Sequence, residues 1–301
     1  MADFAAHTLF GEMPRVEAPQ WDAWPVMRNW GLQGPDIFFF RRVVTGGAPF
    51  HSLGSRMHKE RISSFFGSMA RYVDGLPEPQ RDQGIAYLYG FLCHYSLDSI
   101  IHPYVHYHQE RLAKGFPELT PDAVHCQIET DIDVDLYSLL RKEPVNRFKP
   151  GAYYDVTPAQ RELIGCILSA SIFAAYGMVV PAAEIAAAVA DTLAVQKALF
   201  APTKLAYAVA GLTESLLHKQ GSFTSHVKAY KPKWDSLNLR KAPWCCPWEP
   251  DRKRTDSVPD LLELARLRAE ELCAAYGRMF GQGEIVDWSF AEDFSGRRCE
   301  D

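Results

Sequence analysis

The stretch Gly90-Phe-Leu-Cys-His94-Tyr-Ser-Leu-Asp98-Ser-Ile-Ile-His102 places polar side chains at regular intervals in an apolar segment. Residues four apart on an α-helix differ by only about 40° in direction, so its first histidine and its aspartate leave one side of a helix together. His102 lies one turn further along, but Pro103 follows it, and a proline disfavours the α conformation of the residue before it. We therefore expect this helix to end or kink near Ile101.

A second segment, His125-Cys-Gln-Ile-Glu129, repeats the four-residue spacing later in the chain. Thr120 as a capping residue and Pro121 at the first helical position predict a helix that begins just before this segment. The first stretch is apolar on the sides around His94, and a buried charge must be paired or bind a metal. Three imidazoles and two carboxylates on two helix faces are ligands that suit Zn²⁺. We therefore predict a zinc site between the two helices.

The other histidines support one composite site, because eight of the ten lie within the first 125 residues. His58 is expected at the start of its helix and His51 in the loop before it, and we expect one of the two to reach the site. Asp36 follows Gly34-Pro35, a turn that can direct an aspartate into a cleft; capping of the next segment is equally open. The remaining four histidines are expected in loops or on the surface: His106, His108, His218 and His226.

The chain is expected to be mostly α-helical. We find no alternating strand pattern of useful length and no internal repeat, and the short Ile37-Phe-Phe-Phe40 run does not decide between strand and helix. We predict a single all-α domain over residues 1–301, with the metal-site motifs in residues 7–130 and C-terminal helices over 157–280 that complete the bundle. The expected helices cover residues 53–73, 80–101, from 121 onward, 157–176, 181–200, 203–218 and 257–280, with loops over 103–121 and 219–256.

Composition narrows the function classes. The hydrophobic share of 47% and the charged share of 23% exclude a disordered chain. The net charge of −5, with acids and bases interspersed, gives no signal for nucleic acid or an anionic membrane. No signal peptide and no apolar run long enough for a membrane-spanning helix are apparent. The seven scattered cysteines contain no CxxC pair, so we expect reduced thiols and a cytoplasmic protein.

Several competing site types lack their motifs. The chain has no HExxH, no phosphate-binding GxxxxGK[ST] and no His-Asp dipeptide of the HD-type phosphohydrolases. Gly281-Gln-Gly283 lacks the third glycine of a dinucleotide-binding fingerprint. The Glu-x-x-His pairs of a di-iron bundle are also missing.

Five segments together resemble the bacterial zinc-dependent phospholipase C family, whose helical fold is shared with single-strand-specific zinc nucleases. They occur in order between residues 7 and 130, and the second half of the chain is similar only in being helical. The segments are His7-Thr-Leu-Phe-Gly11, Gly34-Pro-Asp36-Ile-Phe-Phe, Gly54-Ser-Arg-Met-His58, Gly90-Phe-Leu-Cys-His94-Tyr-Ser-Leu-Asp98-Ser-Ile-Ile-His102-Pro and His125-Cys-Gln-Ile-Glu129.

The resemblance implies two to three zinc ions per chain and hydrolysis of a phosphodiester, either a small molecule or a phospholipid head group. Two metals a few ångströms apart clamp a phosphate and lower the pKa of a bridging water. Asp36 is the implied general base as well as a ligand. The implied ligands are Asp36, His58 (or His51), His94 and Asp98 for one zinc, His102, His125 and Glu129 for a second, and His7 with Asp98 for a third.

Two alternatives stay open. A nuclease or nucleotidase on the same fold is expected to show a basic, aromatic cleft. A non-catalytic protein stabilised by metal is expected to have coordination closed by protein ligands, whereas a catalytic site keeps a position for water.

Overall fold

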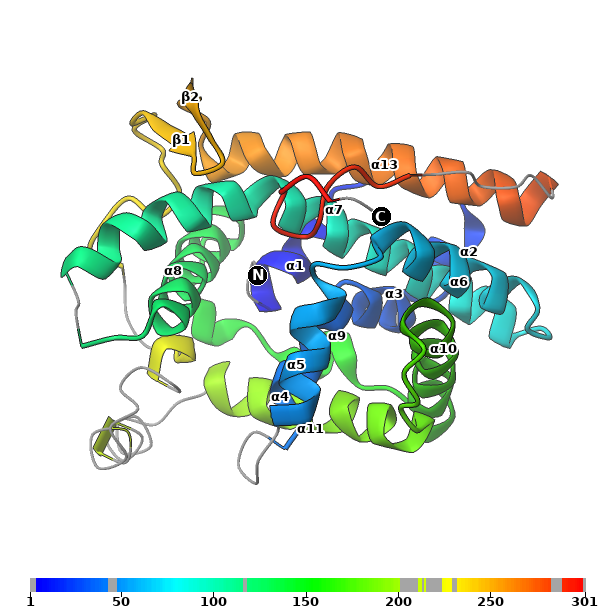
Figure 1. The fold of residues 1–301 in the computed structure, drawn as a ribbon. Coiled ribbons are helices and arrows are strands. Elements are labelled where there is room, and N and C mark those ends of the chain that lie inside the picture. The colour runs from blue at the N-terminus through cyan, green and yellow to red at the C-terminus, as the bar shows by residue number, and fades with distance from the viewer. Residues whose placement is uncertain are drawn as a thin grey trace.

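The computed structural model is helical throughout most of its described part, which confirms the predicted all-α fold (Figure 1). It describes residues 4–42, 48–115, 118–200, 211–212, 214, 224–228, 232–282 and 289–299. The described helices are α1 (Phe4–Phe10), α2 (Pro19–Ala23), α3 (Pro25–Gly31), η1 (Gly34–Asp36), α4 (Ile37–Phe40), α5 (Ala48–Met57), α6 (Ile62–Asp74), α7 (Gln80–Leu112), η2 (Ala113–Gly115), α8 (Pro121–Arg141), η3 (Val145–Arg147), α9 (Pro150–Tyr154), α10 (Pro158–Tyr176), α11 (Ala182–Phe200), η4 (Thr224–His226) and α13 (Val258–Gln282).

Helix α7 is the centre of the molecule. Nearly every residue between Gly84 and Val105 is buried, on all sides of the helix. A helix that is apolar all round must be covered by neighbours, and α3, α6, α8 and α13 contact it. Figure 1 shows α13 lying along it. The polar side chains of the quoted stretch therefore lie in the middle of the core.

Two glycines allow α3 and α7 to touch. A Cβ atom added at Gly90 would lie 2.0 Å from the carbonyl oxygen of Arg28, and one added at Gly31 would lie 2.1 Å from that of Tyr87. Backbone atoms cannot move aside as a flexible side chain can, so no other residue fits either position without displacing a helix.

We expect Gly90→Ala to lower the free energy of unfolding by about 3 kcal/mol or more, because the added methyl group forces the two helices apart. Gly67→Ala in α6 is the matched control, since its added Cβ would meet only the end of the Arg71 side chain, at 3.4 Å. That control should change stability by less than about 1 kcal/mol. Equal denaturant midpoints for the two variants would contradict this account of the α3–α7 contact.

The first helix does not end near Ile101, which was one of the two outcomes expected there, and the prediction that residues 103–121 are a loop is wrong. Helix α7 continues through Pro103 to Leu112. A proline inside a helix costs about 3 kcal/mol, and contacts on both sides of it oppose that cost. His102 donates from Nδ1 to the Phe294 carbonyl (2.5 Å), and the Tyr104 hydroxyl donates to the Ser236 carbonyl (3.0 Å).

The single helix predicted over residues 53–73 is two helices, α5 and α6. They are separated at Arg61, whose φ of +54° is left-handed and cannot continue a helix. The guanidinium of Arg61 donates to the Ala175 carbonyl (2.9 Å), which holds the turn. Helix α5 begins at Ala48, earlier than predicted, so His51 lies within it and not in a loop. His58 follows the end of α5 and does not start a helix. The undecided run Ile37–Phe40 is helix α4.

The second half of the chain follows its predicted boundaries closely. Helices α10, α11 and α13 begin and end within two residues of the expected positions, and α8 begins at the expected Pro121. Their capping contacts are present, with the Thr120 side chain accepting from the Ala123 N–H and the Thr157 side chain from the Gln160 N–H. The helix expected over 203–218, with His218, lies almost entirely outside the described residues.

One small hairpin in the expected loop over 219–256 was missed. Strands β1 (Trp244–Cys246) and β2 (Glu249–Arg254) pair antiparallel at one end of the molecule (Figure 1). Strand β2 is almost entirely charged and exposed, so it lacks the alternation of apolar residues that predicts a strand. Among the described helices, none is both long and apolar enough to span a membrane.

Candidate metal centre

Eight of the nine predicted ligands come together in three adjacent groups at the middle of α7. Within each group the candidate ligand atoms all lie within 4.8 Å of one another. We call them the inner, middle and outer groups. The inner group is His7, His94 and Asp98; the middle group is Asp36, His58 and His94; the outer group is His102, His125 and Glu129.

The inner group joins α1 to α7 and is completely buried. Asp98 Oδ1 lies 3.2 Å from His7 Nε2, and Asp98 Oδ2 lies 3.2 Å from His94 Nε2. The two imidazole rings stack with centroids 4.3 Å apart. All three residues are 0% exposed, so water does not compete for their polar atoms.

The middle group adds the turn before α4 and the end of α5. His58 Nε2 lies 3.1 Å from Asp36 Oδ1, and His94 Nε2 lies 4.0 Å from the same oxygen. Gly34 makes this turn possible, because its φ is +48° and an added Cβ would lie 2.3 Å from the His94 ring. Only glycine lets the chain pass so close to that imidazole and present Asp36 to it.

The outer group lies between α7 and α8. Glu129 Oε1 is 3.0 Å from His125 Nε2 and 3.5 Å from His102 Nε2. The predicted four-residue spacing on α8 accounts for the first contact. Continuation of α7 through Pro103 accounts for the second, because it keeps His102 on the helix face that carries Asp98.

Three of the histidines are oriented by backbone carbonyl groups. Nδ1 of His58 lies 2.7 Å from the Gly54 carbonyl oxygen, Nδ1 of His94 lies 3.0 Å from that of Leu32, and Nδ1 of His102 lies 2.5 Å from that of Phe294. A carbonyl only accepts hydrogen bonds, so each Nδ1 carries a proton, and in the neutral imidazole Nε2 keeps a lone pair. Metal-binding histidines are held in this way.

The remaining polar atoms fit the coordination of a metal ion. Nε2 of His58, His94 and His102 is buried and makes no hydrogen bond to the described part of the chain. The nitrogen–oxygen separations within the groups are 3.0–4.0 Å. Two donors bound tetrahedrally to one zinc at about 2.1 Å each lie roughly 3.4 Å apart. The buried groups can therefore hold metal ions.

The electrostatics of the site favour neutral imidazoles in the outer group and an ionised Asp98, whereas Asp98 and Asp36 raise the pKa of His94 against the lowering effect of its burial. Burial lowers the pKa of His102 and of His125 well below the ordinary value, so both imidazoles are neutral at neutral pH. Burial alone would raise the pKa of Asp98, but His94 and His102 lower it and hold it well below its usual range. Neutral imidazoles and an ionised carboxylate bind a cation without first losing protons.

His51, the alternative to His58, stays outside the three groups. Its side chain is exposed, and its ring lies edge-on to Phe39 with centroids 4.8 Å apart. His58 is 7% exposed and belongs to the middle group. Of the two candidates, the structure thus brings only His58 to the other ligands.

Sequence reasoning missed three residues that lie beside the ligands. His106 is on α7 rather than in a loop, and its ring centroid is 5.0 Å from that of His125. One oxygen, Gln109 Oε1, lies 2.9 Å from His106 Nδ1 and 3.1 Å from His125 Nδ1. Phe294 accepts from His102 and donates its N–H to the His58 carbonyl (3.0 Å). The four-residue spacing of His102 and His106 could have indicated that both lie on one helix face. The contact of Phe294 uses a backbone carbonyl, which no sequence pattern identifies.

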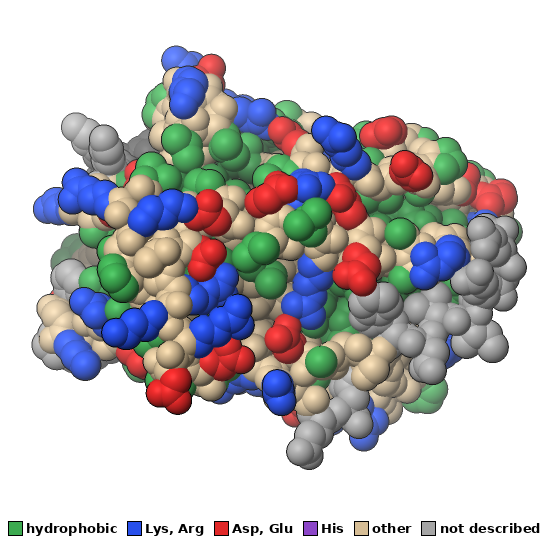
Figure 2. All heavy atoms as spheres, turned by 90° about the horizontal axis from the view of Figure 1, so that it is seen from above, with side chains coloured by type: hydrophobic (Ala, Val, Ile, Leu, Met, Phe, Trp, Pro, Cys, Tyr) green, Lys and Arg blue, Asp and Glu red, His purple; other side chains and the backbone are tan. Residues whose placement is uncertain are grey.

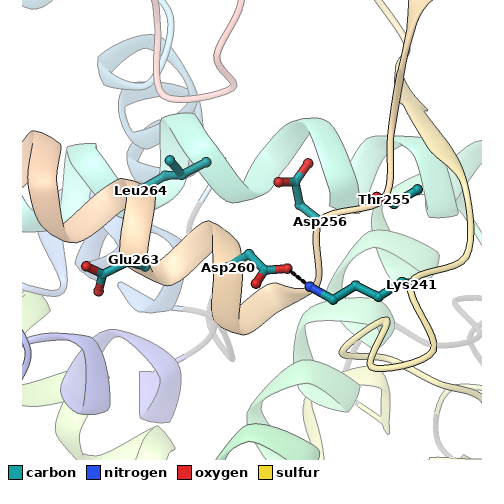
Figure 3. A pocket seen from close by; sticks show the side chains of 6 residues that line it. All are labelled: Lys241, Thr255, Asp256, Asp260, Glu263 and Leu264. Carbon is teal, nitrogen blue, oxygen red and sulfur yellow. Dashed lines mark hydrogen bonds and ion pairs between the residues drawn. The ribbon is translucent and has the colours of Figure 1, made fainter.

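A surface hollow of about 400 Å³ lies at the start of α13, away from these groups (Figure 3). Its lining includes Lys241, Glu263 and Asp260, and the ammonium of Lys241 pairs with the Asp260 carboxylate. This pair and the hydrogen bonds from Ser257 lower the pKa of Asp260 to about 2. Asp260 thus already binds Lys241 and Ser257 at the start of α13. We therefore interpret the hollow as a structural feature and not as a second centre.

Comparison with known proteins leaves the site to be interpreted from its own geometry. No protein-family model matches the chain, and no curated protein and no solved structure matches it significantly.

Proposed function

We propose that this protein is a zinc-dependent hydrolase that cleaves phosphodiester bonds in the manner of a phospholipase C. The sharing of ligands between neighbouring groups carries the proposal. His94 belongs to both the inner and the middle group, and Asp98 Oδ2 lies 3.9 Å from Nε2 of His58 and 4.0 Å from Nδ1 of His102. A single structural zinc needs only four ligands. Adjacent groups that share a histidine and lie around one carboxylate suit two or three metals a few ångströms apart, as in phosphoester hydrolases.

The donor set supports zinc as the metal. Each group combines imidazole nitrogen with carboxylate oxygen and contains no thiolate, a set that suits Zn²⁺. When bound, zinc would stabilise charge on the phosphate oxygens and supply a water of lowered pKa.

Asp36 is the residue that we assign to proton transfer. Its side chain is 10% exposed, whereas those of His94 and Asp98 are 0% exposed. It therefore lies on the accessible side of the middle group, where a carboxylate can accept the proton of an attacking water. His125, with 17% of its side chain exposed, marks the accessible side of the outer group. We infer that the substrate reaches the centre between these two residues.

The inner group suits a different task. Its complete burial favours an ion that stabilises the packing of α1 on α7 and does not contact substrate.

The seven cysteines form no disulfide, which supports our further proposal that the protein works in the reducing cytoplasm.

Hydrolysis of bis(p-nitrophenyl) phosphate by the purified protein, with and without added zinc, tests the proposed function. We expect activity that a chelator abolishes and zinc restores. Asp36→Asn should lower kcat at least about 100-fold, because the amide accepts no proton from water. Asp122→Asn, an exposed acid in the first turn of α8, is the matched control and should keep wild-type activity. A zinc-loaded protein that cleaves neither this compound nor a lipid or nucleotide diester would refute the proposal.

A further inference from the structure

Three residues outside the ligand set form a continuous row beside the outer group. The His106 ring lies 5.0 Å from that of His125 and 5.5 Å, edge-on, from that of Trp248. The guanidinium carbon of Arg297 lies 4.7 Å from the centre of the Trp248 ring. We call His106, Trp248 and Arg297 the rim. The rim leads from a candidate metal ligand to an exposed cation.

The rim is built to hold its shape. Gln109 accepts from His106 Nδ1 (2.9 Å), and Trp248 Nε1 donates to the Gly296 carbonyl (2.9 Å). The Arg297 N–H donates to Asp293 Oδ1 (3.0 Å). The side chains of His106 and Trp248 are thus fixed by hydrogen bonds, and the backbone of Arg297 is held by Asp293. Stacking of a guanidinium on tryptophan further restricts its position.

The guanidinium of Arg297 is not neutralised by an ion pair. No carboxylate in the described part of the chain lies within ion-pair distance of it, and its side chain is exposed. Asp293 is the nearby acid, but it is 7% exposed and its Oδ1 already accepts from the N–H groups of Ser295 and Arg297. The cation therefore remains available to an anion from outside.

Cationic side chains lie close enough to the rim to act on His106. Burial lowers the pKa of His106 to about 4, and Arg297 and Lys59 contribute to the lowering through their positive charge. In Figure 2 Lys and Arg side chains gather on the left part of the face, the end where Figure 1 places the β1–β2 hairpin that carries Trp248.

We propose that the rim binds a second anionic group of the substrate, so that the substrate class is a phosphodiester bearing a further phosphate or carboxylate. This inference rests on the proposed hydrolase function. Arg297 donates charge-assisted hydrogen bonds to the additional anion, while the ester is held at the ligand groups. A quaternary ammonium head group would need the face of the Trp248 ring, where the Arg297 guanidinium already lies. Repulsion between the two positive charges disfavours such a substrate.

Nucleotides and phosphorylated lipid head groups share this chemistry. Two matched pairs separate them: a thymidine p-nitrophenyl phosphodiester with and without a second phosphate on its sugar, and dihexanoyl phosphatidylinositol with and without a phosphate on its ring. A larger rise in kcat/KM from the extra phosphate in the thymidine pair would identify a nucleotide substrate. A larger rise in the phosphatidylinositol pair would identify a phosphorylated lipid head group.

The kinetic test compares wild type, Arg297→Gln and Arg298→Gln, all loaded with zinc. We expect wild type to prefer the phosphorylated member of a pair about tenfold, the worth of one charge-assisted hydrogen bond. Arg297→Gln should lose this preference through a higher KM while keeping kcat. Arg298→Gln removes another exposed charge one residue away and should keep the preference. Equal preference in all three proteins would overturn the rim assignment and leave the proposed hydrolysis intact.

A binding measurement keeps the two proposals distinguishable. Calorimetric titration of thymidine bisphosphate and thymidine monophosphate into the same three proteins requires no turnover. About tenfold tighter binding of the bisphosphate, lost only in Arg297→Gln, would support the rim even if no diester were cleaved. Equal affinity of the two nucleotides for wild type would reject it.

Discussion

Replacing His94 by alanine is expected to remove metal from the inner and middle groups and to abolish hydrolysis. Among the described residues, His94 alone belongs to two groups, and its Nε2 lies 3.2 Å from Asp98 Oδ2 and 4.0 Å from Asp36 Oδ1. No neighbouring side chain can replace it, because the turn at Gly34 closes directly over the ring. Elemental analysis and hydrolysis of bis(p-nitrophenyl) phosphate, with circular dichroism to follow helix content, measure the effect.

Helix content should stay nearly intact, since α7 is held by apolar packing along its whole length. His51→Ala is the matched control, because it removes an exposed imidazole of the same half of the chain. It should retain wild-type metal content and activity. Glu129→Ala should lose the outer-group metal and hydrolysis in the same way. Hydrolysis retained in His94→Ala would contradict the assignment of the centre.

Removal of metal is expected to lower the melting temperature by roughly 10 °C or more. An ion present at about 1,000 times its dissociation constant stabilises the folded state by about 4 kcal/mol, and each kcal/mol corresponds to about 2–4 °C in a chain somewhat shorter than this one. The groups tie α1, the Gly34 turn, the end of α5 and α8 to α7. Without the ion, Asp36 and Asp98 remain as buried carboxylates near one another, which further weakens the fold.

Differential scanning calorimetry of the chelated and the zinc-reloaded protein makes this comparison. Reloading should restore the original transition, which separates metal loss from irreversible damage. His94→Ala should respond less to the chelator than wild type, because it has fewer ions to lose. Identical transitions before and after chelation would mean that no ion contributes to the fold.

The centre could be found in the sequence because its two main segments are local. His94 with Asp98, and His125 with Glu129, are one helical turn apart, so the helical period alone brings their side chains together. Their apolar neighbours indicated burial, and the structure buries His94, Asp98 and Glu129 but leaves His125 half-buried. The cap at Thr120 acts within one turn and was equally predictable.

The features that sequence reasoning missed depend on distant contacts. Pro103 would end an isolated helix, but α7 continues because Phe294, 192 residues away, binds His102 from outside the helix. That contact uses a backbone carbonyl, and any residue type supplies one. The rim likewise assembles from α7, the hairpin and the segment 289–299. Neither its composition nor its spacing along the chain identifies it.

The metal content of the purified protein tests the central claim most directly. Elemental analysis against protein concentration should give two or three zinc ions per chain, in accord with three adjacent ligand groups. A protein that contains no metal after purification, and takes up none when zinc is added, would contradict the account, and the convergence of eight buried or half-buried ligands on α7 would then require another explanation.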